Sequence, residues 1–248
     1  MCGRFAFLLP HESWRGLYKV LNDFPHPPRY NVAPTQPIVV ILEREGRRTA
    51  ELFRWGFVPG WVKDPREWPL LINARAETMA DKPAFRVAVR NSRCIVPANG
   101  YFEWMKGPDG KRQPYYITRA DDQPMAFAGL YSTWAGPNGE EVDTACIVTV
   151  EPNLEVSNIY DRMPAILWDE GAIDAWLNTR EVIGDEALRL AHPPAPGSMK
   201  YHPVGSGIGN ANNDNPELIV PVDPDAEEPV PAPKPKKRIA GGEQLDLF

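Results

Sequence analysis

The sequence predicts an α+β fold built around a mainly antiparallel, barrel-like β-sheet with helices at its periphery. Apolar and aromatic runs bounded by Gly, Pro or charged residues, which are typical of strands, outnumber the helical patterns. These runs do not alternate regularly with helices, as they would in a doubly wound fold. The chain has 248 residues, 43% of them hydrophobic, so it is long enough to bury a sizeable core.

The individual elements follow from local patterns. Trp14, Leu17, Tyr18 and Leu21 recur at helical spacing, which predicts an amphipathic helix over residues 11–22. Further short helices are expected around 83–90, 171–178 and 184–191. Strands are predicted at 37–43, 51–57, 93–97, 100–105, 114–118, 125–134 and 145–150.

The C-terminal end of the chain has a different composition. Residues 221–235 contain six prolines, several acids and no aromatic residue, so this segment is expected to be extended and unable to pack a core. The chain therefore divides into a folded domain at 2–221, a flexible proline-rich and charged linker at 222–243, and a terminal QLDLF at 244–248. The tail after the domain is expected to be disordered.

Composition excludes several classes of protein. No apolar run is long enough for a membrane span, and the N-terminus lacks the apolar region of a signal peptide. Cys2, Cys94 and Cys146 are odd in number and lack CxxC spacing, so we expect neither disulfides nor a zinc site, no cofactor, and a cytoplasmic location. A net charge of −6 argues against a uniformly basic nucleic-acid-binding surface but allows a local basic groove.

Cys2 is the most informative residue in the sequence. Removal of Met1 would leave Cys2 at the N-terminus, with an α-amine and a thiol on adjacent carbons. Such an aminothiol condenses with an aldehyde to an imine, and the thiol then closes onto the imine carbon to form a five-membered thiazolidine. The reference pKa values, about 7.7–8.0 for the amine and about 8.5 for the thiol, leave both groups partly deprotonated at neutral pH.

Further segments combine Pro or Gly with polar and aromatic side chains. They are RYNVAPTQ, RWGFVPGW, NARAET, RCIVPANGYFEW, DRMPAIL and a late NNDNPELIVP, and they follow the opening MCGRF. In this order, from Cys2 to about Pro221, they resemble the SRAP family of SOS response-associated proteins. The resemblance implies the SRAP fold and a role in DNA repair. Family members use the N-terminal cysteine to trap abasic sites in single-stranded DNA as thiazolidine crosslinks, which protects the lesion at replication forks.

The same resemblance implies the catalytic residues. Cys2 would be the nucleophile, Asn73 of NARAET the amide at the sugar, and Glu103 of GYFEW the acid. The aromatic neighbours of Glu103 are expected to raise its pKa, so that it can donate a proton near neutral pH. Tyr160 stands where the family has a histidine directly before DRMP, and a phenol is a poor base at pH 7 although it can donate a hydrogen bond.

Residues for DNA binding are implied in the same way. Arg4, Arg75 and Arg162 match family positions that hold phosphates, which suits the fork of a guanidinium. Arg86 is either a further phosphate ligand or a solvated surface charge. The flat apolar side chains that could stack on unpaired bases are Pro34, Trp55, Trp61 and Trp104, of which Trp104 is favoured and some are expected to belong to the core.

The terminal QLDLF suggests a protein partner. It resembles the short peptide by which bacterial replication and repair proteins dock on the sliding clamp. Gln244, Leu245, Leu247 and Phe248 would enter pockets of the clamp, and the proline-rich linker would act as a tether. This pattern also indicates a bacterial source.

Three classes of function remain open from the sequence. The first is an abasic-site sensor that forms a covalent DNA adduct, an activity for which the family is also classed as a lyase. The second is an N-terminal-cysteine peptidase or other hydrolase, which needs a base such as histidine near the thiol. The third is a noncovalent reader of single-stranded or modified DNA. A monomer is expected in each case.

Overall fold

The computed structural model describes residues 2–224. Met1 and most of the predicted linker and tail, including the predicted clamp-binding residues Gln244, Leu245, Leu247 and Phe248, lie outside the described residues. The fold is α+β, as predicted, and it contains two β-sheets. No helix in the described part of the chain is both long and apolar enough to cross a membrane.

The larger sheet closes on itself as a barrel of five strands. The pairing runs β10–β4–β3–β6–β9 and returns from β9 to β10. All of these pairs are antiparallel except β10 with β4. The barrel strands are β3 (Pro37–Arg44), β4 (Arg47–Trp55), β6 (Arg93–Ala98), β9 (Met125–Ala135) and β10 (Glu141–Val150). Three short strands join it: β5 (Asn73–Arg75), β11 (Met163–Pro164) and β12 (Ile166–Leu167).

Several barrel strands are buried on both faces, which explains their unbroken apolar sequences. All six residues of β6 are buried, and so are the last seven of β10. The barrel interior covers one face of these strands, and helices or short strands cover the other. The predicted strand at 51–57 begins earlier than expected, at Arg47, and ends at Trp55.

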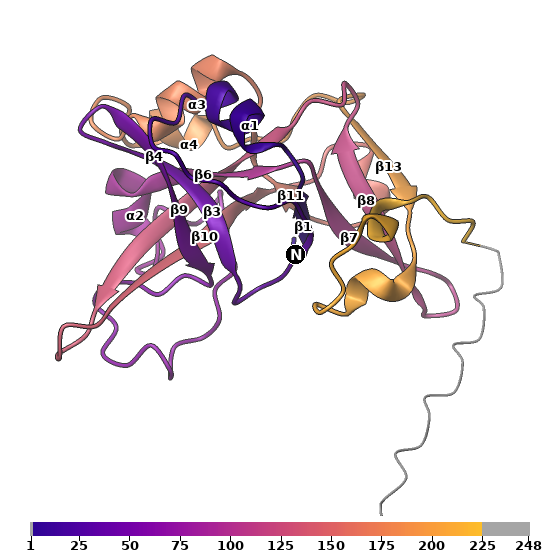
Figure 1. The fold of residues 1–248 in the computed structure, drawn as a ribbon, viewed down its shortest axis with the longest axis horizontal. Coiled ribbons are helices and arrows are strands. Elements are labelled where there is room, and N and C mark those ends of the chain that lie inside the picture. Colours follow the sequence, from indigo (N-terminus) through magenta and orange to yellow (C-terminus); the bar gives the residue numbers. More distant parts are fainter. Residues whose placement is uncertain (1, 225–248) are drawn as a thin grey trace, which may run out of the picture.

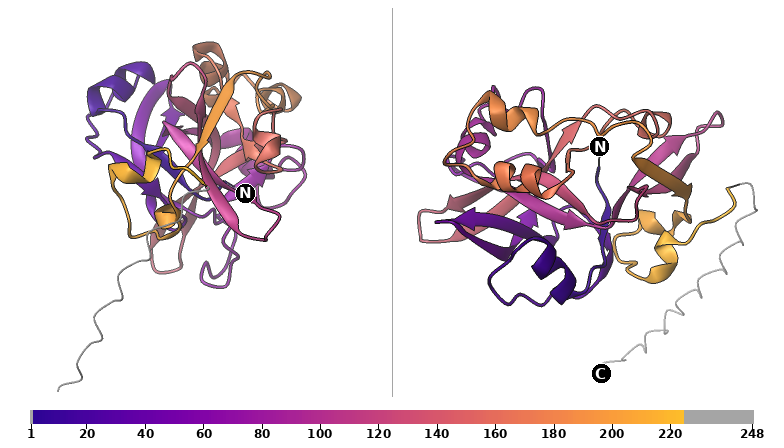
Figure 2. Two further views of the ribbon diagram at one scale, coloured as in Figure 1. Left: turned by 90° about the vertical axis from the view of Figure 1, so that its right-hand side faces the viewer. Right: turned by 90° about the horizontal axis from the view of Figure 1, so that it is seen from above.

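A second sheet stands beside the barrel in Figure 1. Its order is β13–β8–β7–β1–β2, all antiparallel. The strands are β1 (Phe5–Phe7), β2 (Arg29–Val32), β7 (Gly100–Lys106), β8 (Arg112–Arg119) and β13 (Met199–Pro203). β1 runs between the barrel and this sheet, and the views of Figure 2 agree, so the residues before β1 lie at the seam of the molecule.

Four α-helices of residues 2–224 lie at the periphery. They are α1 (His11–Leu17), α2 (Arg86–Asn91), α3 (Glu170–Leu177) and α4 (Asp185–Arg189). Three short 3-10 helices also occur: η1 (Val156–Asn158), η2 (Ser206–Gly209) and η3 (Pro216–Ile219). The predicted helix at 11–22 is too long, because Lys19 adopts a left-handed conformation with φ 56°. Of the apolar residues in this range, Trp14, Tyr18 and Val20 reach the core, whereas Leu17 and Leu21 are exposed.

Arg93 is a buried cation that ties the helices to the barrel. Its side chain donates to the carbonyl oxygens of Trp176 (2.6 Å), Val89 (2.9 Å), Asn178 (3.0 Å) and Val182 (2.8 Å). These acceptors lie in α2, at the end of α3 and in the turn that follows it. A single guanidinium therefore satisfies carbonyl groups that helix ends would otherwise leave unpaired.

Replacing Arg93 by methionine is expected to lower the free energy of unfolding by at least about 3 kcal/mol, because several buried carbonyl groups lose their donor. Urea denaturation followed by tryptophan fluorescence measures the change. Arg90→Met is the matched control, since Arg90 is exposed near the end of α2, three residues before Arg93, and should change stability little. Equal stabilities of the two variants would contradict this role of Arg93.

Candidate functional site

Cys2 lies at the seam between the barrel and the second sheet, directly before β1. It is fully buried. The Nδ2 of Asn73 donates a hydrogen bond to the backbone oxygen of Cys2 at 3.1 Å. Asn73 is the first residue of β5, which pairs in parallel with β10 on the barrel. The structure thus brings together two residues that are 71 positions apart in the sequence.

Glu103 reaches the same place from β7. Its side chain is only 2% exposed, and burial raises its pKa to about 7, with the nearby charge of Asp161 acting in the same direction. β7 pairs with β1, so that Tyr101 lies opposite Phe5. A carboxyl group with a pKa near 7 can both give and take a proton at neutral pH.

The thiol of Cys2 is held in its protonated form. Burial raises its pKa well above the ordinary value, and the charge of Glu103 raises it further. Glu103 and Cys2 are therefore close enough to interact electrostatically. A peptidase cysteine has the opposite property, because it is activated as a thiolate by a lowered pKa.

Tyr160 joins this group from the turn after η1. It is half-buried, and burial together with the charge of Glu103 raises its pKa. The phenol therefore stays protonated at neutral pH and acts as a donor of hydrogen bonds rather than a base. All four catalytic residues predicted from the sequence, Cys2, Asn73, Glu103 and Tyr160, lie in one region.

The histidines do not supply the base that Tyr160 lacks. Within residues 2–224, their contacts involve other parts of the molecule. His11 accepts from the backbone N–H of Phe24, and His26 packs against the ring of Phe7. His192 and His202 lie near the backbone oxygens of Pro193 and Ile219. In the same residues, no group of three or more His, Cys, Asp and Glu side chains is placed to hold a metal ion.

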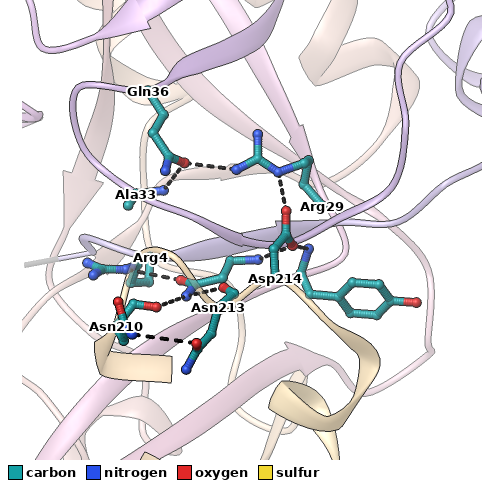
Figure 3. A network of polar contacts seen from close by, with 9 residues as sticks. Arg4, Arg29, Ala33, Gln36, Asn210, Asn213 and Asp214 are labelled. Atoms are coloured by element: carbon teal, nitrogen blue, oxygen red, sulfur yellow. Dashed lines mark hydrogen bonds and ion pairs between the residues drawn. The ribbon is translucent and has the colours of Figure 1, made fainter. Parts of the chain in front are cut away.

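Arg4 is fixed by a network of neutral groups, shown in Figure 3. Its Nε donates to Asn31 Oδ1 at 3.0 Å, and its Nη2 donates to the backbone oxygen of Gly209 at 3.1 Å. Nη1 makes a longer contact, 3.4 Å, with the backbone oxygen of Gly3. A guanidinium has five N–H donors, so one remains on each terminal nitrogen. Arg4 has no carboxylate partner within residues 2–224, and its fork can hold an external anion.

Asn31 and Asp214 hold this network together. Asn31 is fully buried, and its Nδ2 donates to the backbone oxygens of Ile208 (3.3 Å), Asn210 (3.0 Å) and Asn213 (2.9 Å). Asp214 Oδ1 accepts from the backbone N–H of Tyr30 at 2.6 Å and of Asn31 at 3.2 Å. Asp214 thereby binds backbone donors of β2, which is the edge strand of the second sheet.

Replacing Asn31 by alanine should weaken noncovalent binding to single-stranded DNA roughly tenfold, because the guanidinium of Arg4 loses its anchor and its fixed orientation. Fluorescence anisotropy with single-stranded DNA that carries no abasic site measures this binding without a covalent step. Asn158→Ala is the control, since Asn158 is exposed and bonds only to neighbouring carbonyl oxygens. Unchanged DNA affinity of a folded Asn31→Ala variant would show that Asn31 does not position Arg4.

The other predicted phosphate ligands differ in their surroundings. Arg75 at the end of β5 and Arg86 at the start of α2 are exposed, and neither forms an ion pair within the described part of the chain. Arg162, by contrast, forms an ion pair with a carboxylate of the protein. Its two Nη atoms donate to the carboxylate oxygens of Glu77 at 3.0 and 2.9 Å, and Nη2 also donates to the backbone oxygen of Thr149 at 2.7 Å. Phosphate binding by these three arginines stays a prediction.

The residues predicted to stack on bases differ in how far their side chains are exposed to solvent. Trp55 is fully buried, and its Nε1 donates to the backbone oxygen of Ile72, so it belongs to the core. Trp61 is 58% exposed and packs edge-on against Trp68. Trp104 is half-buried on the face of β7 opposite Glu103, and Pro34 is half-buried in the turn after β2. Trp61, Trp104 and Pro34 thus keep surface on which a base could stack.

Sequence reasoning missed several residues that shape this site. Asn31 and Asp214 lie in segments that the motifs include, but no pattern in the sequence shows that they meet. The ion pair between Glu77 and Arg162 could not be predicted either, because the two residues are 85 positions apart in the sequence. The sequence indicates Tyr101 only as one of the aromatic neighbours of Glu103, and nothing in it predicts a role for its hydroxyl.

Comparisons with known proteins identify the family of the chain. The model of the SOS response associated peptidase (SRAP) family matches residues 1–211. The chain is 36% identical over 222 residues to the abasic site processing protein YoqW of Bacillus subtilis, covering 88% of this chain and 99% of that protein. It is 37% identical over 231 residues to YedK of Escherichia coli, covering 90% and 100%. For HMCES of Mus musculus, the identity is 31% over 272 residues, covering 90% and 76%.

Solved structures show the same fold. A crystal structure of a protein from Bacteroides thetaiotaomicron superposes with a TM-score of 0.79 and 27% sequence identity, covering 89% of this chain and all of that one. A second, from Bordetella bronchiseptica, has a TM-score of 0.70 at 24% identity, covering 82% and 100%. On the strength of the family model and of relatives aligned over nearly its full length, this chain belongs to the SRAP family.

Proposed function

We propose that this protein traps abasic sites in single-stranded DNA as a thiazolidine crosslink through Cys2. One observation carries the proposal: Cys2, Asn73 and Glu103 converge at the seam of the fold, and Glu103 has a pKa of about 7. The names of the relatives, abasic site processing proteins, indicate the substrate. The open form of an abasic sugar presents an aldehyde, which is the partner that an aminothiol requires.

The reaction balances as a condensation that releases one water. The α-amine of Cys2, freed by removal of Met1, attacks the aldehyde carbon to give a carbinolamine. Loss of the former aldehyde oxygen as water gives an imine. Both hydrogens of the amine are lost in this step overall: the proton that the oxygen takes up on leaving is balanced by one released from nitrogen, so the imine is neutral. The thiol then adds across the C=N bond, with sulfur on the carbon and the proton on nitrogen. The high pKa of the buried thiol suits this order, because the amine attacks first and the thiol adds second.

The neighbouring side chains have separate roles in these steps. Glu103 donates the proton that allows the oxygen to leave as water, for which a pKa of about 7 is suited. Asn73 holds the backbone oxygen of Cys2 and so orients the nucleophile. Tyr160, protonated and near Glu103, donates a hydrogen bond where the family has a histidine.

Contacts to DNA come from a local surface rather than from the overall charge of −6. Arg4, Arg75 and Arg86 supply guanidinium groups without carboxylate partners in residues 2–224, and arginine suits phosphate binding. Arg162 is a further ligand once a phosphate displaces Glu77 from it. Trp104, Trp61 and Pro34 offer stacking surface for bases, which favours unpaired DNA.

The alternative functions fit the site less well. A cysteine peptidase needs a thiolate and a base, whereas the Cys2 thiol has a raised pKa and the histidines lie elsewhere. A noncovalent DNA reader would need no acid of shifted pKa beside a cysteine at position 2. Free Cys94 and Cys146 agree with the cytoplasmic location that we propose.

We propose in addition that Gln244, Leu245, Leu247 and Phe248 dock the protein on a bacterial sliding clamp. Three apolar residues follow a proline-rich and charged stretch of sequence, which favours a binding motif. Deleting residues 244–248 should abolish binding to purified clamp, as measured by surface plasmon resonance. The deletion should leave crosslinking to abasic DNA unchanged on a denaturing gel. Clamp binding by the deletion variant would refute this assignment.

A denaturing gel tests the proposed function. The processed protein should give a slower band with single-stranded DNA that contains one abasic site, and none with the same strand carrying an intact base. Cys94→Ala and Cys146→Ala are matched controls, since both cysteines are buried in the barrel and should leave the band unchanged. No band from a protein that binds the same DNA would favour the noncovalent reader.

A further inference from the structure

Tyr101 carries a buried polar atom without a partner. Its side chain is fully buried, and no group in residues 2–224 forms a hydrogen bond with its hydroxyl. Burying a hydroxyl without a hydrogen bond is unfavourable, and most buried tyrosines avoid it. Tyr18 shows the usual arrangement, because its hydroxyl donates to the backbone oxygen of Met125 at 3.0 Å.

The unpaired hydroxyl lies beside the residues of the candidate site. Side chains alternate along a strand, so Tyr101 and Glu103 share one face of β7 while Phe102 and Trp104 occupy the other. The burial pattern agrees, since Tyr101 packs in the main core together with Cys2, whereas Phe102 belongs to a separate cluster. Phe5, three residues after Cys2, is paired with Tyr101.

The electrostatic interactions of Tyr101 also indicate that it lies near Cys2 and Glu103. Burial, and then the charges of Cys2 and Glu103, raise the pKa of Tyr101 well above its ordinary value. The hydroxyl therefore keeps its proton throughout the neutral range. It can therefore donate a hydrogen bond but cannot act as a base.

A second unpaired atom of the site complements this donor. Asn73 donates through Nδ2 to the backbone oxygen of Cys2, but its Oδ1 is buried and has no partner among residues 2–224. The site thus holds one buried donor, the hydroxyl of Tyr101, and one buried acceptor, Oδ1 of Asn73. A ligand hydroxyl both accepts and donates a hydrogen bond, so it is the group that satisfies both atoms.

We propose that Tyr101 is a further catalytic residue, whose hydroxyl donates a hydrogen bond to the oxygen on the sugar carbon that Cys2 attacks. This inference rests on the proposed crosslinking function. As the amine adds, negative charge grows on the aldehyde oxygen, and the Tyr101 hydroxyl is placed to stabilise it. When the carbinolamine has formed, its hydroxyl donates in turn to Asn73 Oδ1. Tyr101 keeps its proton throughout, and Glu103 supplies the proton with which the oxygen leaves as water.

Single-turnover crosslinking of Tyr101→Phe to abasic single-stranded DNA tests the proposal. We expect the maximal rate to fall by about 100-fold, as when one donor to a developing oxyanion is removed, with the DNA concentration for half-maximal rate unchanged. The thermal midpoint of unfolding should not fall, because the change removes an unsatisfied buried hydroxyl. Tyr18→Phe is the matched control and should behave in the opposite way: less stable, with an unchanged crosslinking rate.

A rate for Tyr101→Phe within twofold of wild type would overturn the proposal, because the hydroxyl would then have no part in the reaction. A fall in stability equal to that of Tyr18→Phe would overturn it too, since the hydroxyl would then have a structural partner. Failure of the proposed function looks different, since the wild-type protein itself would form no crosslink.

Discussion

Replacing Cys2 by alanine should abolish the stable crosslink and leave an imine that borohydride reduction can trap. Alanine is as suitable as cysteine for removal of Met1, so the α-amine remains free in the variant. The amine still condenses with the aldehyde, but without a thiol the imine cannot close to a thiazolidine and reverts when the protein is denatured. The expected loss of the unreduced band is complete, which makes this the largest effect of any single substitution.

The measurement is a denaturing gel of Cys2→Ala with abasic single-stranded DNA, with and without borohydride. Cys146→Ala serves as the control for removing a buried thiol elsewhere, because Cys146 lies within β10 of the barrel. An unreduced crosslink that persists in Cys2→Ala would place the bond on another residue. A crosslink lost both with and without reduction would show that the amine is not the first nucleophile.

Replacing Glu103 by glutamine should slow crosslinking by about 100-fold or more, because glutamine cannot donate the proton with which the oxygen leaves. The wild-type rate should follow a bell-shaped pH profile. The rate rises on the acid limb because the α-amine, with a reference pKa of about 7.7–8.0, loses its proton, and it falls on the alkaline limb because Glu103, with a pKa of about 7, loses its own. Since the pKa of the base lies above that of the acid, the maximum is expected between about pH 7 and pH 8. The glutamine variant should retain the acid limb and lose the alkaline one.

The same substitution should alter stability in a pH-dependent manner. The folded protein keeps the Glu103 proton up to about pH 7, whereas the unfolded chain loses it near the ordinary value of 4.5. The unfolded state therefore binds fewer protons between these values, and this group lowers stability as the pH rises through that window. Glu103→Gln should exceed wild type by on the order of 3 kcal/mol at about pH 8 and match it at about pH 4.

Thermal unfolding across this pH range measures the difference in stability. Glu141→Gln, at an exposed position at the start of β10 and outside the site, controls for the loss of one carboxylate. A Glu103→Gln variant that crosslinks at the wild-type rate, or one whose pH profile keeps its alkaline limb, would contradict the assignment of the acid.

The barrel was predictable because its strands carry their signal locally. The runs in β3, β6, β9 and β10 are apolar over most of their length, since the fold covers both faces of these strands. Short strands carry no such signal. β5, with three residues, owes its conformation to pairing with β10, and nothing in its sequence alone shows that partner.

The first helix shows how periodicity can mislead. Leu17 and Leu21 continue the helical spacing set by Trp14 and Tyr18, yet both are exposed and the helix ends at Leu17. The chain turns at Lys19, whose positive φ is stabilised by the surrounding fold rather than by its residue type. Spacing indicates which residues can share a face but not how far the helix continues.

The candidate site was predictable in its chemical groups but not in its supporting contacts. Cys2, Asn73 and Glu103 stand in motifs that the resemblance to the family assigns. The burial that raises the pKa of Glu103 to about 7, and the network that fixes Arg4, depend on strands paired across the fold. Long-range pairing of this kind leaves no pattern in the sequence near the residues concerned.

Intact mass spectrometry of the crosslinked full-length protein tests the central claim most directly. The account predicts a chain without Met1 whose adduct weighs as much as the chain and the DNA together less one water. Peptide mapping should then place the bond on Cys2. An adduct on another residue, or a chain that retains Met1 and crosslinks as fast as the processed protein, would contradict it.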